Sequence, residues 1–240
     1  MVGEIIIKAV IFDFGQTLVD AANGFREAEK LAQKKLFADP GLSRPEDFLT
    51  TYRRIRKELH DRSNFSRKSL WQAVYQFYGL KPDTRLLETW ETAYWETVKV
   101  NSDLFPETVN VLKSLSSKYQ LGMITNTQGQ QRSGAHRISR FPELETYFKV
   151  IIVAGENSIP PKPDPAPFRL CLQELNIKPS EAVYVGDDYR IDVCGAQDAG
   201  LHAVWLKHHC VSRSWPDVRT ATPIISDLEE LLDIERVLKM

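Results

Sequence analysis

Residues 11–20, IFDFGQTLVD, carry the end of an apolar run into a polar loop, and the meaning of this loop decides how the whole chain is interpreted. Its triplet Asp13-Phe14-Gly15 is also the one that marks the magnesium-holding aspartate of protein kinases. A kinase needs a glycine-rich loop, a strand lysine and a catalytic loop upstream of that triplet. The twelve residues before Asp13 contain none of these. We therefore do not expect a kinase, and the rest of the sequence must explain Asp13.

Runs of apolar, mostly β-branched residues recur along the chain and predict a parallel sheet. They occupy residues 5–13, 121–125, 150–154, 182–186 and 203–206. Continuous apolar runs suit strands that are covered on both faces, as in a parallel sheet. Helical patterns lie between or after these runs, as in Val109, Leu112, Leu115; Phe168, Leu170, Leu172, Leu175; and Leu228, Leu231, Leu232. The alternation predicts an α/β fold with a Rossmann-like parallel sheet as its core.

The segment between the first two runs breaks this alternation. It contains no comparable strand run, and apolar residues there follow helical spacing, as in the stripe Trp71, Val74, Tyr75 and Tyr78. We therefore predict an inserted all-helical domain. The predicted boundaries are residues 20–99 for the insert and residues 1–19 with 100–240 for the discontinuous core, with hinges near Asp20 and Asn101.

Composition limits the class of protein. The chain has 240 residues, 42% of them hydrophobic, which suffices for a large core. Its 31 Lys and Arg residues nearly balance 32 Asp and Glu residues, so we expect neither nucleic acid nor an anionic membrane as a partner. The apolar run at residues 5–12 is too short and too interrupted to span a membrane, and no signal-peptide cleavage site follows it.

The cysteines argue against both a disulfide framework and a zinc site. Cys171, Cys194 and Cys210 are odd in number and form no CxxC spacing. We expect reduced thiols and a cytoplasmic location. The triplet His208-His209-Cys210 looks like a metal cluster, but neighbouring residues on a strand or loop are expected to point apart, so a structural or surface role is favoured.

The insert carries a basic segment and several aromatic residues. Residues 51–68 hold seven basic and two acidic side chains, and a solvated helix face is the favoured interpretation. The alternative is that part of this segment, including Arg53 and Arg56, faces the core and selects an anionic substrate. For most of the aromatic residues we expect a place in the core of the insert; these are Trp71, Trp90, Tyr94 and Trp95.

Polar residues follow the predicted strands at their carboxyl ends, where ligands bind in open parallel sheets. In chain order they are Asp13, Thr125, Asn126, Lys162, Asp187, Asp188 and Asp192. Lys162 lies in a proline-rich loop, and the fixed φ angles of the prolines are expected to stiffen that loop. Carboxylates, a hydroxyl and a lysine are therefore expected to converge at one edge of the sheet.

These pieces, in this order and with a helical insert after the first, resemble the haloacid dehalogenase-like (HAD) superfamily in its helical-cap branch. Asp13 with TLVD at residues 17–20 resembles motif one, Thr125-Asn126 motif two, Lys162 in KPDPAPF motif three, and GDDYRID at residues 186–192 motif four. Each motif is weak alone, but the ordered set is specific and spans the whole chain. The resemblance implies a hydrolase whose insert is a cap domain.

The resemblance also implies a Mg²⁺-dependent reaction on a small phosphorylated substrate. A carboxylate can attack a phosphoryl dianion only if a metal ion and a cation offset the repulsion. The resemblance implies that Asp13 is the nucleophile, which forms an aspartyl-phosphate, and that Thr125 and Lys162 are further catalytic residues. It implies that Mg²⁺ is bound by Asp13, the Gly15 carbonyl and Asp187, with Asp188 or Asp192 in contact with these ligands. The residues implied to contact the substrate are Phe14, Gly15 and Asn126. We expect a monomer or a homodimer.

The sequence departs from the family at Gly15. Family phosphatases carry a second aspartate there, and the general acid–base help that it gives is typically worth about 100- to 10,000-fold. We therefore expect a substrate with a good leaving group. The alternatives are a 2-haloacid dehalogenase and a catalytically weakened protein that binds a phosphorylated ligand. Because dehalogenases need no metal, the acidic pair Asp187-Asp188 favours Mg²⁺-dependent phosphoryl transfer.

Overall fold

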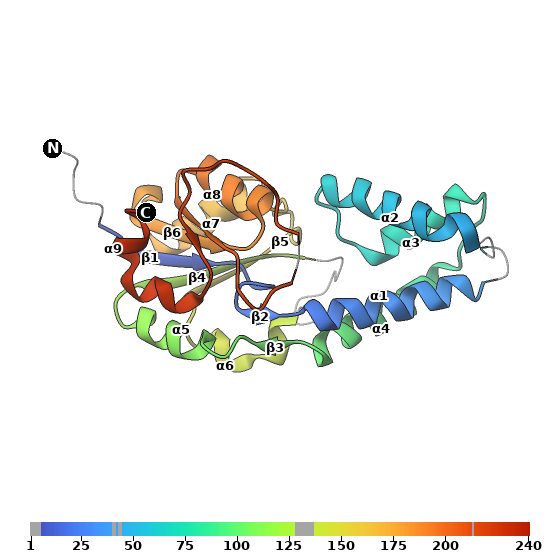
Figure 1. Cartoon of the computed structure of the whole chain (residues 1–240), viewed down its shortest axis with the longest axis horizontal. Coiled ribbons are helices and arrows are strands. Elements are labelled where there is room, and N and C mark those ends of the chain that lie inside the picture. Colours follow the sequence, from blue (N-terminus) through green and yellow to red (C-terminus); the bar gives the residue numbers. More distant parts are fainter. Residues whose placement is uncertain (1–5, 40–41, 43–44, 128–136, 213) are drawn as a thin grey trace. The chain divides into compact units, whose positions relative to one another are not determined.

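The computed structural model describes residues 6–39, 42, 45–127, 137–212 and 214–240 (Figure 1). The chain forms two compact units. The sheet unit contains Met1–Asp20, Asp103–Asn126 and Phe141–Met240, and the helical unit contains Ala21–Ser102 with Thr127–Arg140. Among the described residues, no helix combines the length and the apolar character needed to cross a membrane.

A six-stranded parallel sheet with the order β5-β4-β1-β6-β7-β8 forms the centre of the sheet unit. Its strands are β1 (Ala9–Phe12), β4 (Gln120–Asn126), β5 (Val150–Ala154), β6 (Ala182–Gly186), β7 (His202–Leu206) and β8 (Ile224–Ile225). The predicted α/β fold with a parallel, Rossmann-like sheet is confirmed. Two details differ, because the first strand begins at Ala9 and the two-residue strand β8 is too short to give a sequence pattern.

The strands are apolar throughout because both faces of the sheet are covered. Ala9 and Ile11 of β1 belong to the same buried cluster as Phe168 and Leu172. Val10 and Phe12, which alternate with them, are fully buried as well. Successive side chains of a strand point to opposite faces, so this pattern requires a layer of structure on each side of the sheet.

Helices supply those two layers. In Figure 1, α5 (Thr108–Ser116) and α6 (Pro142–Glu145) lie on one face, and α7 (Ala166–Leu175) and α8 (Gly195–Asp198) lie on the other. The predicted helical pattern at residues 228–232 corresponds to a 3₁₀ segment, Leu228–Asp233, followed by the short helix α9 (Ile234–Val237).

The chain leaves β1 for β4 and β5 on one side and later returns to β6, β7 and β8 on the other. Strand β1 therefore lies at the switch in strand order, where ligands bind beyond the carboxyl ends. Directly after β1, the antiparallel pair β2 (Val19–Asp20) and β3 (Asp103–Leu104) connects the two points at which the sheet unit is interrupted.

The helical unit consists of α1 (Ala22–Phe37), α2 (Pro45–Asp61), α3 (Arg67–Phe77) and α4 (Thr84–Val100), together with the 3₁₀ segment η2 (Arg137–Arg140). Side-chain caps begin two of these helices, since Ser66 accepts a hydrogen bond from Ser69 N and Asp83 accepts from Arg85 N. Trp71, Tyr94 and Trp95 are buried in the unit and Trp90 packs against them, so the prediction that the aromatic residues form a core is confirmed.

Candidate active site

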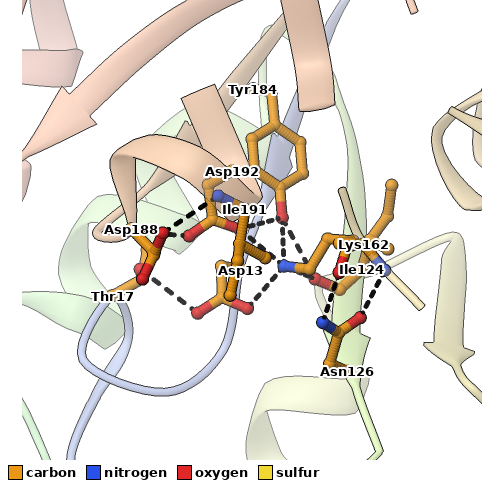
Figure 2. Close-up of polar contacts among 9 residues, drawn as sticks. All are labelled: Asp13, Thr17, Ile124, Asn126, Lys162, Tyr184, Asp188, Ile191 and Asp192. Carbon is orange, nitrogen blue, oxygen red and sulfur yellow. Dashed lines mark hydrogen bonds and ion pairs between the residues drawn. The ribbon is translucent and has the colours of Figure 1, made fainter. Parts of the chain in front are cut away.

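Lys162 lies at the centre of a buried polar cluster beyond the strand ends (Figure 2). Its ammonium Nζ lies 2.8 Å from Asp13 Oδ1, 2.7 Å from Asp192 Oδ1, 2.9 Å from the Ile124 carbonyl oxygen and 2.7 Å from the Tyr184 hydroxyl. Lys162 is only 1% exposed. Buried charges are normally paired, and this ammonium is held between two carboxylates, one of which is the proposed nucleophile.

The peptide of Lys162 is fixed by the side chain of Asn126. Asn126 Nδ2 donates to the Lys162 carbonyl oxygen at 3.0 Å, and the Lys162 N–H donates to Asn126 Oδ1 at 2.7 Å. Both groups are buried. The sequence predicts Asn126 at the substrate and does not indicate this side-chain role.

Three carboxylates gather at the same edge. Asp13, Asp187 and Asp192 each offer an oxygen, and these oxygens lie within 4.8 Å of one another. Asp192 is otherwise engaged, because its Oδ1 accepts from Lys162 and its Oδ2 accepts from Asp188 N at 3.0 Å. An all-oxygen donor set of this kind suits a hard divalent cation such as Mg²⁺.

Tight packing behind the cluster depends on Gly186, the last residue of β6. A Cβ atom at this position would come within 2.5 Å of the Asp192 side chain. Asp192 lies on the helical turn η4 (Tyr189–Cys194), which Asp188 caps by accepting a hydrogen bond from Ile191 N at 2.9 Å. The glycine thus lets the Asp192 carboxylate reach back over the strand toward Lys162.

Burial and charge set the protonation of the cluster. Burial raises the pKa of Asp13 to about 6, against the opposing effect of the Lys162 ammonium. Burial alone would lower the pKa of Lys162, but Asp13 and Asp192 outweigh it and raise that pKa. The pKa of Tyr184 lies well above its usual value because of burial and the nearby carboxylates. The lysine is therefore charged at neutral pH and the tyrosine keeps its proton.

The loop after β1 closes tightly on Asp13. Gln16 has a φ of 62°, and its N–H donates to the Val19 carbonyl oxygen at 2.7 Å. The buried Thr17 hydroxyl lies 3.5 Å from Asp13 Oδ2. Gly15 is not among the residues with positive φ, so its backbone angles do not exclude a side chain.

Thr125, Phe14 and Asp187 are the other predicted site residues, and each is next in sequence to a residue of the site already described. Thr125 is buried at the end of β4, beside Asn126. The Phe14 side chain is fully buried, and its ring centroid lies 6.3 Å from that of Phe141. Any substrate contact by Phe14 must therefore come from its backbone. The Trp205 indole donates to the Asp187 carbonyl oxygen at 3.0 Å, which fixes the main chain of Asp187 against β7.

Tyr184 is the residue of the cluster that the sequence analysis missed. An ammonium has three N–H donors, but four oxygens surround Lys162 Nζ. The Tyr184 hydroxyl lies 3.1 Å from the Ile124 carbonyl oxygen, so it can donate there while accepting from the lysine. Every oxygen is then satisfied. The available signal was a phenol within an otherwise aliphatic strand, AVYVG.

Some basic side chains of residues 51–68 face solvent, and others pair with the partly buried Glu29. Arg53 is exposed, as a solvated helix face requires. Arg56 Nη1 lies 3.4 Å from Glu29 Oε1, and the buried Arg67 Nε lies 3.8 Å from Glu29 Oε2. The pKa of Glu29 is lowered: burial opposes the shift, and Arg67, Tyr52 and Arg56 produce it.

Outside this cluster, one expectation about side-chain direction was wrong. His208, His209 and Cys210 were expected to point apart, but each offers a ligand atom within 4.8 Å of the other two. The chain does not remain extended there, because Val211 N donates to the His208 carbonyl oxygen at 2.9 Å and closes a turn.

Residues 7–200 match the family model of haloacid dehalogenase-like hydrolases. A glyceraldehyde 3-phosphate phosphatase of Pyrococcus furiosus is 26% identical over 95% of this chain and 92% of its own length. The structure of a 2-haloacid dehalogenase from Pseudomonas syringae pv. Tomato DC3000 has a TM-score of 0.65 and 27% identity, covering 98% of this chain and 99% of that one. The magnesium-bound hydrolase YfnB of Bacillus subtilis has a TM-score of 0.65 and 22% identity, covering 98% and 100%.

Proposed function

The chain belongs to the haloacid dehalogenase-like hydrolase family, and from this premise we propose that it is a Mg²⁺-dependent phosphatase that acts through Asp13. The substrate that we propose is a small phosphorylated metabolite, or another phosphate ester with a good leaving group. One observation carries the proposal: a buried carboxylate after β1 is paired at 2.8 Å with a buried ammonium, beside two further carboxylates.

Each residue of the cluster has a role in this reaction. The carboxylate of Asp13 attacks phosphorus, and the bond from phosphorus to the ester oxygen breaks, so that the alcohol or phenol part of the substrate leaves as its alkoxide or phenolate. Water then hydrolyses the aspartyl-phosphate to free phosphate and regenerates the Asp13 carboxylate. The Lys162 ammonium offsets the negative charge of both the carboxylate and the phosphoryl group. Asp192 and Tyr184 hold the ammonium in place. We propose that Thr125 and the Asn126 backbone contact phosphoryl oxygens. The Asn126 side chain holds the Lys162 peptide, and so keeps the ammonium close to Asp13.

The donor set fits Mg²⁺, since it consists of carboxylate and carbonyl oxygens. We propose that Asp13, Asp187 and the Gly15 carbonyl hold the ion, with Asp188 and Asp192 supporting them. When bound, Mg²⁺ supplies positive charge that offsets the charge of the phosphoryl group. Asp192 is better placed to orient Lys162 than to bind the ion, because both of its oxygens already accept hydrogen bonds.

Gly15 leaves this site without the usual acid for the leaving group. A phosphate ester of an acidic alcohol or phenol needs little protonation as it departs, so it loses less from this absence. We propose the helical unit as the cap that selects the substrate. The free state of Cys171, Cys194 and Cys210 supports a reducing, cytoplasmic location.

Turnover of p-nitrophenyl phosphate tests the proposal directly. We expect hydrolysis with Mg²⁺, loss of hydrolysis in EDTA, and loss in the Asp13→Asn variant. The exposed Asp198 of α8 provides a matched control, because Asp198→Asn makes the same change away from the cluster. Activity that persists in Asp13→Asn would defeat the proposal. Retained phosphate binding without any turnover would instead favour the ligand-binding alternative.

A second candidate, 2-haloacid dehalogenase activity, is favoured by the similarity to the solved dehalogenase of Pseudomonas syringae. In that reaction the carboxylate of Asp13 would displace halide from carbon. Halide release from 2-haloacids in the presence of EDTA separates the two reactions, because the phosphatase requires the ion and the dehalogenase does not. We expect no halide release, since the carboxylates around Asp13 fit a metal site.

A further inference from the structure

The turn after β7 carries nitrogen and sulfur donors that the proposed phosphatase reaction does not use. His208 is 1% exposed, whereas His209 and Cys210 are exposed. One nitrogen of each imidazole and the thiol sulfur lie within 4.8 Å of one another. In a tetrahedral zinc site the Zn–N and Zn–S distances are about 2.0 and 2.3 Å. Small shifts that bring these donor atoms closer together would therefore allow all of them to bind one ion.

Hydrogen bonds fix which nitrogen of His208 carries its proton. The Cys210 N–H donates to His208 Nδ1 at 3.2 Å, so Nδ1 holds the lone pair. The opposite nitrogen, Nε2, therefore carries the proton and donates to Glu107 Oε1 at 2.7 Å. A carboxylate that accepts from the far side of an imidazole is the usual support of a metal-binding histidine, because it orients the ring and raises its basicity.

His209 has a lone pair available for a metal ion as well. Its Nδ1 lies 3.1 Å from the Ser226 carbonyl oxygen, which can only accept, so Nδ1 carries the proton and Nε2 the lone pair. The two imidazole rings stack with centroids 4.7 Å apart, and Phe105 stacks on the other face of His208. The buried ring is therefore held in place, while the exposed His209 ring can turn toward a shared ion.

The surroundings favour a cation. An open cleft of about 330 Å³ adjoins the turn. Its lining residues are Pro106, Glu107, Asn110, His209, Cys210, Asp227 and Glu229. Three of these side chains are carboxylates and none is Lys or Arg, so the cleft attracts positive charge and gives an ion a path from solvent. The cleft also leaves room for water in a fourth coordination position.

We propose that His208 Nδ1, His209 Nε2 and the Cys210 thiolate bind a borderline divalent ion such as Zn²⁺. Nitrogen and sulfur donors select Zn²⁺ or Co²⁺ over Mg²⁺, so this site and the all-oxygen cluster at Asp13 take different metals. The ion replaces the Cys210 N–H as the partner of His208 Nδ1. The Cys210 thiol releases its proton to solvent on binding, and no oxidation or reduction takes place.

Cobalt titration tests this site independently of phosphatase activity. Co²⁺ is added to the full chain in excess Mg²⁺, and thiolate-to-cobalt charge transfer is followed in the near ultraviolet. We expect one equivalent of Co²⁺ to give this absorption and Zn²⁺ to displace it. Cys210→Ser should abolish the absorption. Cys194→Ser is the matched control and should retain it, because Cys194 belongs to no such donor group within the described chain.

Glu107→Gln tests the support of His208 without removing a ligand. The amide can still accept the hydrogen bond but carries no charge, so we expect Co²⁺ affinity to fall by about 10- to 100-fold. Circular dichroism of each variant checks that it is folded. The proposal is overturned if the wild type shows no charge-transfer absorption. Equal Co²⁺ binding and absorption in Cys210→Ser would overturn it equally.

Discussion

The Tyr184 hydroxyl lies 2.7 Å from the ammonium nitrogen of Lys162, inside the sheet unit, where neither residue reaches solvent. The hydroxyl and the Ile124 carbonyl oxygen approach to 3.1 Å. The phenol thus links a residue at the end of β4 to the charged centre of the cluster. It accepts one lysine N–H and donates to the Ile124 carbonyl oxygen, which leaves the other two N–H groups for Asp13 and Asp192.

Replacing Tyr184 with Phe removes this link and keeps the ring. We expect a loss of about 1 kcal/mol in the free energy of unfolding, the usual net value of a hydrogen bond. We also expect a lower kcat with little change in KM, because the ammonium can shift away from Asp13. Urea unfolding and p-nitrophenyl phosphate kinetics measure the two effects. Tyr147→Phe makes the same change outside the cluster and should leave kcat unchanged.

Replacing Lys162 with Met leaves Asp13 and Asp192 buried without their shared cation. Breaking a buried ion pair in this way typically costs about 3–5 kcal/mol. The pKa of Asp13 is already raised to about 6, and loss of the ammonium must raise it further. At lower pH, protonation of Asp13 removes one of the two unpaired buried charges in the variant. The variant's deficit in free energy of unfolding relative to wild type should therefore be larger at pH 8 than at pH 5.5. A deficit that does not change with pH contradicts this account.

His60 should make the helical unit sensitive to acid. Burial, with Arg67 and Arg56 nearby, lowers its pKa from 6.5 to about 4. The unfolded chain therefore binds a proton near pH 6.5 that the folded chain refuses until about pH 4. Stability falls as the pH drops through this window. Between pH 7 and 4.5, the free energy of unfolding of the His60→Gln variant should fall less than that of wild type, as measured by urea unfolding. Above pH 8 the difference in free energy of unfolding between the two proteins should not change with pH.

Restoring the missing acid should extend the range of substrates. Gly15 does not have positive φ, so Gly15→Asp is compatible with its backbone angles. General acid–base help is worth about 100- to 10,000-fold, and we expect alkyl phosphates to gain at least the lower part of that range. Phenyl phosphates with acidic leaving groups should gain less. Gly15→Asn has the same shape without the acid, and an equal gain in that variant would rule out proton transfer as the cause.

The sequence could predict the parts of the site that depend on strand ends. Asp13, Lys162 and Asp187 follow apolar runs, and parallel strands bring their carboxyl ends together. It could not predict Tyr184, because the direction of a side chain within a strand depends on register with its neighbours. The turn at residues 208–211 was missed for a related reason: a single backbone hydrogen bond reverses the chain there and brings together side chains that would diverge on a strand.

The side chain of Asn126 holds both backbone polar groups of Lys162. The four-carbon side chain of a lysine is flexible, so an unrestrained ammonium would occupy many positions. Each substrate that bound would then have to order the ammonium again. Here the stem begins from an anchored peptide and ends among fixed oxygens, so the electrostatic field is set before any ligand arrives. In such a site, little reorganisation of the protein is needed during the reaction. The rate is then expected to depend mainly on how well the leaving group stabilises negative charge.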